Sequence, residues 1–231
     1  MIPWAAALVF ALLPVPRLTG PVVDQAGVLS AADERRLDEV ARRALASEGG
    51  TGPQMAFLVV RSLEGEPIED FSIRVAEAWQ LGTAEKDNGL LFVVAVDDRQ
   101  VRVEVGNGIE GEITDAQASR MIREILAPAF REGRYGDGLY AAALQSLQFL
   151  GVDAAGLPPA PRARAERRGR LPIPFLLFLV IFFFGRMFGG RRRRTFWIGP
   201  GMGGFGGFGG AGGGFRGGGG GFSGGGASGR W

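Results

Sequence analysis

The sequence has 231 residues, of which 40 are glycine and none is cysteine or histidine. Without cysteine and histidine, a structural zinc site, a thiol nucleophile, a Ser/His/Asp triad and a redox dithiol are all excluded. Any metal is therefore expected to be a hard, oxygen-liganded ion such as Ca²⁺ or Mg²⁺, and the sequence carries no zinc, haem or nucleotide fingerprint.

Charge is distributed unevenly along the chain. Residues 21–157 contain 23 Asp and Glu against 13 Arg and Lys, whereas residues 158–231 contain 12 Arg against the single Glu166. The acidic first part is long enough to form one compact domain. Its charge disfavours nucleic acid as a partner and favours cations.

Residues 1–20 are predicted to be a signal peptide. The apolar run from Ile2 to Val15 is short for a membrane span and has the length of a secretory hydrophobic region. A retained anchor and a misassigned start are the alternatives, because no Arg or Lys precedes the run and no small-residue cleavage site precedes Pro21.

Between residues 21 and 152, the apolar periodicity alternates between helix and strand. Ser30 is expected to cap a helix that ends near Ser47, and Thr114 to cap one that ends near Leu126. Further helices are predicted over residues 68–79 and 135–150, and strands over residues 54–60, 90–96 and 101–105.

The run LLFVVAV at residues 90–96 is apolar at every position, so helices are expected on both faces of the sheet that contains it. Residues 97–100 are short enough only for a hairpin to the next strand. The fold class is therefore predicted to be α/β, a three-layer α/β/α sandwich on a small mixed sheet. In this sandwich a right-handed β-α-β unit is joined to an antiparallel hairpin.

A Pro/Arg-rich linker, residues 153–170, leads to a second apolar run, LPIPFLLFLVIFFFGRMF at residues 171–188. This run is predicted to be a transmembrane helix rather than a buried core helix, because it has no polar face and a helix of its length rises about 27 Å. The arginine cluster and Gly-rich tail, residues 189–231, are predicted to be disordered, since they bury too little side chain to offset the entropy of ordering. Two roles for the tail stay open: weak docking of its Phe residues and Trp231 on a partner, or an inert spacer.

The orientation of the predicted span follows from the N-terminus. Five arginines flank residues 171–188 on the upstream side, and Arg186 with Arg191–Arg194 makes five at its downstream end, so the positive-inside count is a tie. The export signal then predicts a single-pass cell-membrane protein, with the domain outside the cytoplasm, periplasmic or extracellular, and the tail cytoplasmic. The expected partners are membrane lipid, through residues 171–188, and another membrane protein or complex.

Acidic and amide side chains gather at one end of the predicted sheet. Asp87 and Asn88 precede the strand at 90–96, and Glu110 follows the hairpin partner of that strand. With a further ligand from the loop at Asp24, they are candidate ligands of Ca²⁺ or Mg²⁺. The alternative is that the sequences DNG and GNG only form turns.

Asp97 and Asp98 form a second candidate acidic site at the tip of the predicted hairpin. At the usual rise of a strand they lie about 23 Å from Asp87, so they cannot share one ion with it. The alternative reading is a turn, because Asp often opens one.

Three stretches of the sequence together resemble the TPM domain family, which includes photosystem II repair proteins of the thylakoid lumen. They are DQAGVLS at residues 24–30, DNGLLFVVAVDDRQVRVEVGNGIEGEIT at residues 87–114 and FREGRYGDGL at residues 130–139. Many bacterial members also end in a span and a tail similar to GGGFSGGGASGRW. The resemblance implies metal-dependent acid phosphatase activity, divalent-cation binding, or accessory and repair roles beside membrane complexes.

Two hypotheses of function follow. The first is a membrane-anchored, extracytoplasmic, cation-binding accessory or quality-control module for membrane proteins or complexes. The alternative is a divalent-metal-dependent acid phosphatase in which Asp87 and Glu110 act as metal ligands or acid/base groups. Phosphoryl transfer needs cationic groups near the phosphoryl oxygens, and only Lys86 and Arg102 are expected near that end, which favours the first hypothesis.

Overall fold

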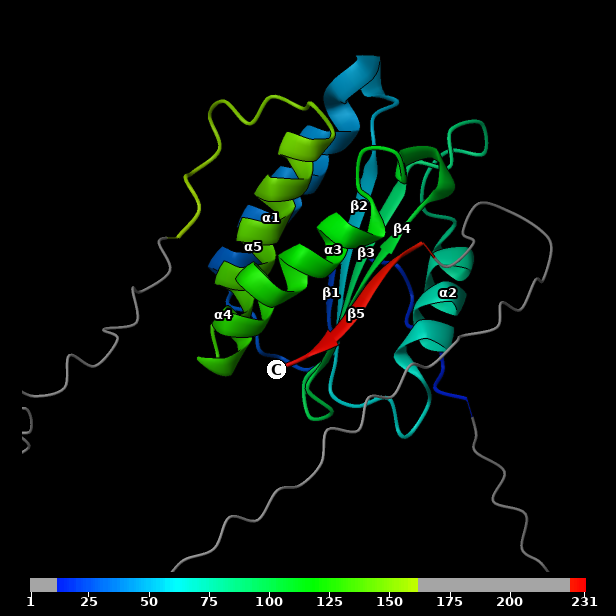
Figure 1. Cartoon of the computed structure of the whole chain (residues 1–231), viewed down its shortest axis with the longest axis vertical. Coiled ribbons are helices and arrows are strands. Elements are labelled where there is room, and N and C mark those ends of the chain that lie inside the picture. The colour runs from blue at the N-terminus through cyan, green and yellow to red at the C-terminus, as the bar shows by residue number, and fades with distance from the viewer. Residues whose placement is uncertain (1–11, 162–224) are drawn as a thin grey trace, which may run out of the picture. The chain divides into compact units, whose positions relative to one another are not determined.

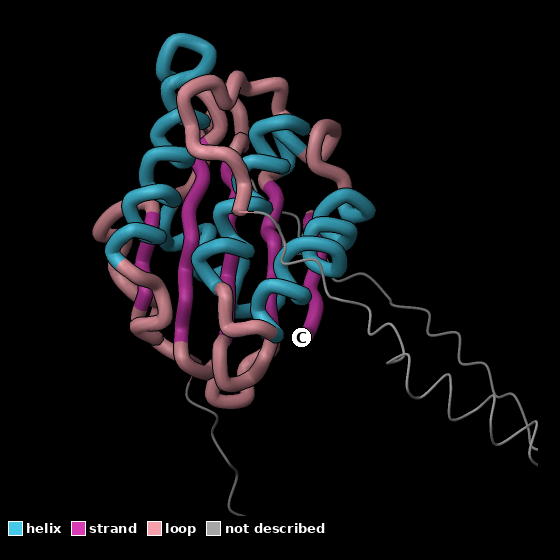
Figure 2. The backbone as a smooth tube through the Cα atoms, turned by 90° about the vertical axis from the view of Figure 1, so that its left-hand side faces the viewer, coloured by secondary structure: helices cyan, strands magenta, loops and turns pink. Residues whose placement is uncertain are grey.

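The computed structural model describes residues 12–161 and 225–231. A mixed five-stranded sheet forms the middle layer, with α2 on one face and α1, α3, α4 and α5 on the other (Figure 1). The strands lie side by side through the domain (Figure 2). The predicted α/β fold is therefore confirmed. In chain order the elements are β1 (Val22–Asp24), α1 (Ala31–Ala46), η1 (Ser47–Gly50), β2 (Gln54–Val60), α2 (Ile68–Trp79), β3 (Gly89–Ala95), β4 (Gln100–Val105), η2 (Asn107–Ile109), α3 (Asp115–Met121), η3 (Ile122–Leu126), α4 (Ala127–Arg131), α5 (Tyr135–Phe149) and β5 (Gly226–Arg230).

The sheet buries apolar side chains on both of its faces. The strand order is β1-β2-β3-β4-β5, with β1, β2 and β3 parallel and β4 antiparallel to both β3 and β5. All seven residues of β3 are buried, as its continuous apolar run predicts. Phe57 and Phe92 stack on the face toward α1 and α5, with ring centroids 5.1 Å apart. Leu58 and Leu91 pack on the face toward α2.

The two helical crossovers have opposite hands. The parallel strands β1, β2 and β3 follow one another in a single direction across the sheet, yet α1 and α2 pack on opposite faces. Two steps in the same direction over opposite faces must differ in hand. One of the two crossovers is therefore of the uncommon left-handed kind, and the right hand of the predicted β-α-β unit stays a prediction.

Two helices begin at the predicted caps. Ser30 and Asp33 form a capping box at the start of α1, and Thr114 and Gln117 form one at the start of α3. The second of these helical segments continues past the predicted end near Leu126, through the π-helical turn η3 and into α4. Pro128 has no N–H to donate, and the wider π turn just before it accommodates that loss.

The prediction of a disordered tail is wrong for Gly226–Arg230, which form β5 at the edge of the sheet. Their composition excludes a core of their own. An edge strand, however, needs only a neighbour with unpaired N–H and C=O groups and space for its backbone. The predicted span at 171–188 and most of the tail lie outside the described residues. Among the residues that are described, no helix is long and apolar enough to cross a membrane.

Part of the predicted signal peptide packs against the domain. The indole N–H of Trp79 donates to the carbonyl of Pro16 at 2.7 Å, and Arg74, which is paired with Glu66, donates to the carbonyl of Leu13 at 2.9 Å. Removal of residues 1–20 stays a prediction. If it takes place near residue 20, the buried indole N–H of Trp79 loses this acceptor.

Candidate functional site

The loops that carry the DNG and GNG sequences interlock through their backbones. The amide of Gly106 donates to the carbonyl of Gly89 at 2.8 Å, and the amide of Gly108 donates to the carbonyl of Asp87 at 3.1 Å. A β-carbon at Gly106 would overlap the Asp87 carbonyl, and one at Gly108 would overlap the carbonyl of Lys86. Asp87 itself has a left-handed backbone with φ of 47°. These glycines are thus required by the close approach of two chain segments.

Asn88 is 4% exposed, and both ends of its amide are hydrogen bonded to backbone. Its Oδ1 accepts from the amide of Thr83 at 3.1 Å, and its Nδ2 donates to the carbonyl of Thr51 at 3.1 Å. Asn88 therefore connects the loop after α2 to the segment before β2. This arrangement supports the turn interpretation of the DNG sequence.

Asp24 lies at the opposite end of the sheet from Asp87. In the strand register, Asp24 is level with Val59, whereas Gly89, two residues after Asp87, is level with Gln54. Five residues of strand correspond to about 17 Å. The carboxylate of Asp24 instead accepts from the amides of Ala26, Gly27 and Leu29 at 2.8 to 2.9 Å. The structure thus does not bring Asp24 together with the other predicted ligands.

Asp97 and Asp98 lie at the tip of the β3–β4 hairpin, as the sequence predicts. The carboxylate of Asp98 accepts from the hydroxyl of Ser62 at 3.1 Å and from the amide of Leu63 at 2.6 Å. The amide of Asp97 donates to the carbonyl of Arg61 at 2.8 Å. Both residues hold the loop after β2 in place, which supports the turn interpretation, and the second acidic site stays a prediction.

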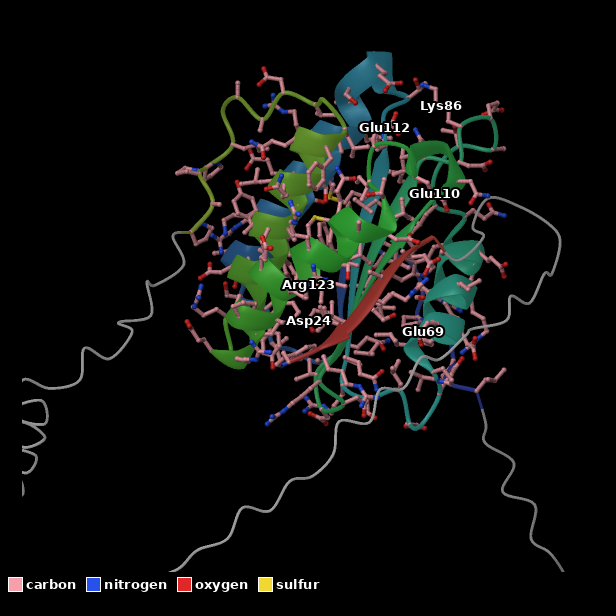
Figure 3. All side chains as sticks on the ribbon, in the orientation of Figure 1. Asp24, Glu69, Lys86, Glu110, Glu112 and Arg123 are labelled. Atoms are coloured by element: carbon pink, nitrogen blue, oxygen red, sulfur yellow. The ribbon has the colours of Figure 1, made fainter. Side chains whose placement is uncertain are left out.

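Of the predicted metal ligands, Asp87, Asn88 and Glu110 remain at one end of the sheet. Figure 3 shows Glu110 near Lys86 at the upper end and Asp24 nearer the lower end. Within residues 12–161 and 225–231, no group of three or more acidic side chains is placed to hold a metal ion. The Ca²⁺ or Mg²⁺ site stays a prediction, now centred on Asp87 and Glu110.

The sequence did not predict the site at the outer edge of β4, where residues 225–231 are bound. β5, red in Figure 1, runs beside β4 and packs against α3. The amide of Val105 donates to the carbonyl of Gly225 at 3.0 Å, and the amide of Trp231 donates to the carbonyl of Arg99 at 3.3 Å. We use the name β4 groove for the edge of β4 together with the residues of α2, α3 and η3 that contact this segment.

Glycine is required at two positions of the bound segment, Gly226 and Gly229. A β-carbon at Gly226 would overlap the carbonyl of Val103, and Gly226 also has φ of 119°, in the region that only glycine adopts easily. A β-carbon at Gly229 would overlap the side chain of Ile122, and one at Gly225 would overlap the carboxylate of Glu110. The backbone of Val103 and the branched side chain of Ile122 leave no space for a larger residue at Gly226 and Gly229, whereas the flexible carboxylate of Glu110 can turn aside at Gly225.

Trp231 fills an aromatic corner at one end of the β4 groove. Its ring meets Phe130 edge-on at 4.9 Å between centroids and Tyr135 at 6.1 Å. Phe130 and Tyr135 are themselves 5.1 Å apart. Both belong to the FREGRYGDGL stretch, so that stretch contributes the contact surface for the indole. Contacts of this kind contribute about 0.5–1.5 kcal/mol each beyond the area they bury.

The face of the β4 groove toward α2 is polar and buried. Arg102 is 5% exposed and pairs with Glu104, which is 0% exposed, at 2.5 Å. Ser72 donates to the same Oε2 of Glu104 at 2.9 Å, and Arg102 donates to the hydroxyl of Ser228 at 3.1 Å. The other carboxylate oxygen of Glu104 has no hydrogen-bond partner among the described atoms. The bound segment thus contributes a hydroxyl to a buried ion pair.

Two carboxyl groups of this face have shifted pKa values. Burial raises the pKa of Glu104 above its ordinary value, and the bonds from Arg102 and Ser72 offset only part of that effect. Burial also acts to raise the pKa of Glu69, but the bond to Ser228 and the charges of Arg102 and Arg230 outweigh it, so the pKa of Glu69 is lowered. Glu69 therefore favours a bound segment with a hydroxyl and a positive charge.

The fold and this edge define a mixed α/β domain whose sheet is completed by a segment from far along the sequence. Residues 22–148 match the TPM domain, and the chain belongs to the TPM domain family. The solution NMR structure of the N-terminal domain of a protein from P. gingivalis is 36% identical, with a TM-score of 0.52. The match covers 57% of this chain and 82% of that one.

An N-terminal domain of a Corynebacterium glutamicum protein, also solved by NMR, is 16% identical with a TM-score of 0.45. That match covers 67% of this chain and 95% of the other. Among curated proteins, none matches this chain.

Proposed function

We propose that this chain is a non-catalytic accessory module for membrane proteins, in which the β4 groove binds an extended segment by strand addition. The observation that carries the proposal is that residues 225–231 pair with β4 as an added strand and make specific side-chain contacts with the domain. Backbone pairing supplies affinity in strand addition, and pockets for individual side chains supply specificity. The β4 groove has both kinds of contact, in the register with β5 and in the contacts to Gly229, Ser228 and Trp231.

The module is proposed to be held at the cell membrane through residues 171–188, with its TPM domain and the paired residues 225–231 on the same side of the membrane, outside the cytoplasm. The sequence supports this placement through the length and apolarity of that run and through the N-terminal apolar segment. An anchored domain with a strand-binding edge meets extended segments of neighbouring membrane proteins at high local concentration.

A peptide-binding measurement tests the strand-addition function. The full chain carrying Trp231→Ala has lost the aromatic anchor of its own segment, so its β4 groove is expected to bind a labelled peptide GGGASGRW, the sequence of residues 224–231. The matched peptide GGGASVRW places valine against Ile122 and is expected to bind at least about tenfold more weakly, since forced overpacking costs about 1–3 kcal/mol. Fluorescence polarisation measures both affinities. Equal binding of the two peptides, or of neither, would contradict the proposal.

Cation binding and phosphatase action are tested on the same full chain. Calorimetric titration with Ca²⁺ and with Mg²⁺ is expected to give heat of binding that Asp87→Ala reduces, if Asp87 and Glu110 hold an ion. Asp97→Ala is the matched control, because Asp97 lies at the other end of the sheet. No heat with either ion would end the cation hypothesis. Metal-dependent phosphatase turnover that Asp87→Ala abolishes would replace the accessory function with the enzymatic one.

A further inference from the structure

We propose that residues 225–231 are the resident ligand of the β4 groove, so that a partner binds only by displacing them. The inference rests on the proposed strand-addition function and adds to it the chemistry of the partner and a form of regulation. The partner is an extended Gly-rich segment with the same pattern: glycine at the positions of Gly226 and Gly229, a hydroxyl at that of Ser228 and an indole at that of Trp231.

The two sides of the resident strand make different kinds of contact with the domain, apolar on one side and polar on the other. On one side, Ala227, Gly229 and Trp231 face the apolar core, where Ile122 limits the size of the middle residue. On the other side, Ser228 accepts from Arg102, and Arg230 lies opposite Gln100. Because side chains alternate between the faces of a strand, one bound segment makes both kinds of contact at the same time. A segment slipped by one residue would bring Ser228 to the apolar side and Trp231 to the polar side.

The resident strand is held at an edge and is replaceable. None of its residues is fully buried, and Ser228 and Arg230 are exposed, in contrast with the seven buried residues of β3. Residues 162–224 separate it in sequence from the rest of the domain. Its pairing therefore depends on the contacts of a short edge strand, whose opening costs less free energy than unfolding of the domain.

Tethering gives the resident segment an advantage over a free one of the same sequence. A ligand joined to its receptor binds as an intramolecular partner at a high effective concentration. A free segment must therefore bind more tightly, or be abundant, before it displaces the resident one. The resident segment therefore inhibits the binding of other segments to the β4 groove.

A disulfide that locks the resident strand tests the inference. Gln100 and Arg230 are directly opposite each other, and they form a non-hydrogen-bonded pair, because the bonded pairs flank them at Arg99 with Trp231 and at Val101 with Gly229. The side chains of such a pair approach closely enough for a disulfide. Because the chain has no cysteine of its own, Gln100→Cys with Arg230→Cys gives one defined bridge. In the control, Gln100→Cys with Ala227→Cys, the two thiols lie on opposite faces of the sheet and no bridge is expected.

Binding of the labelled peptide GGGASGRW is then compared among full-length forms. The Trp231→Ala chain is expected to bind at least about tenfold more tightly than the wild type, and the oxidised double-cysteine chain is expected not to bind until it is reduced. If the wild type binds as tightly as Trp231→Ala, residues 225–231 are not a resident ligand, and the strand-addition function survives alone. If no form binds, the strand-addition function fails. If the oxidised and reduced chains bind equally, the peptide binds elsewhere and both proposals fail.

Discussion

Replacement of Arg102 by methionine is expected to lower the free energy of unfolding by about 3–5 kcal/mol at neutral pH. Methionine fills a similar volume but leaves the carboxylate of Glu104, which is 0% exposed, without its positively charged partner. It also removes the donor to Ser228. Chemical denaturation of the full chain measures the loss.

The deficit of Arg102→Met is expected to shrink as the pH falls from 7 toward 5. Burial already raises the pKa of Glu104 above its ordinary value, and loss of the guanidinium raises it further. Between the pKa of the unfolded chain and the higher pKa of the native state, the native state binds more protons, so lowering the pH stabilises it. The double variant Arg102→Met with Glu104→Gln has no buried charge and is expected to recover most of the loss, with little pH dependence. A deficit that is independent of pH in the single variant would show that lost packing, rather than the isolated carboxylate, is the cause.

Replacement of Gly108 by alanine is expected to lower the free energy of unfolding by about 1–3 kcal/mol. The new β-carbon would overlap the carbonyl of Lys86, a backbone atom that cannot turn aside as a flexible side chain can. For a domain of this size, the loss corresponds to a fall of several degrees in Tm.

Gly111→Ala is the matched control, because nothing lies within 4 Å of a β-carbon there. Thermal melting followed by circular dichroism compares the two substitutions. Equal melting temperatures would mean that the GNG sequence is not under steric constraint, and the case for a ligand-binding role of that loop would return.

The elements that the sequence predicted best are those whose signals are local. Ser30 and Thr114 cap their helices as expected, and the apolar run at 90–96 forms a strand buried on both faces. The end of the third helix was missed, because the π-helical turn before Pro128 keeps the helix going. Whether the helix ends or continues at Pro128 depends on the packing around the helix rather than on the proline itself.

The sequence misplaced one member of the predicted site, Asp24, because its position depends on the alignment between strands. Asp24 and Asp87 both stand beside strands, but only the register shows that they lie at opposite ends of the sheet. Asn88 was a candidate ligand because an amide oxygen can bind a hard cation. In the structure, both ends of its side-chain amide are instead hydrogen bonded to backbone. The interlocked loops explain its neighbouring glycines without any ligand.

The β4 groove was not predicted because the high glycine content of residues 189–231 indicated disorder for the whole tail. Gly226, Gly229 and Trp231 were read as part of a low-complexity segment, yet each fits a specific contact. A signal was present in the sequence: the last residues depart from the Phe–Gly pattern before them and end in a single large aromatic side chain. Trp231 contacts Phe130 and Tyr135 of the same chain, and docking of the tail on another protein stays a prediction.

The pairing of β4 with β5 also limits how many times the chain between them can cross a membrane. Two strands that share backbone hydrogen bonds must occupy the same aqueous compartment, and Val105 donates to Gly225. Between these two residues, the chain can therefore cross a membrane only an even number of times. A molecule that crosses once, at residues 171–188, with its tail in the cytoplasm cannot form β5. In any membrane-embedded form that keeps this strand, the two ends of the intervening sequence emerge on the same side.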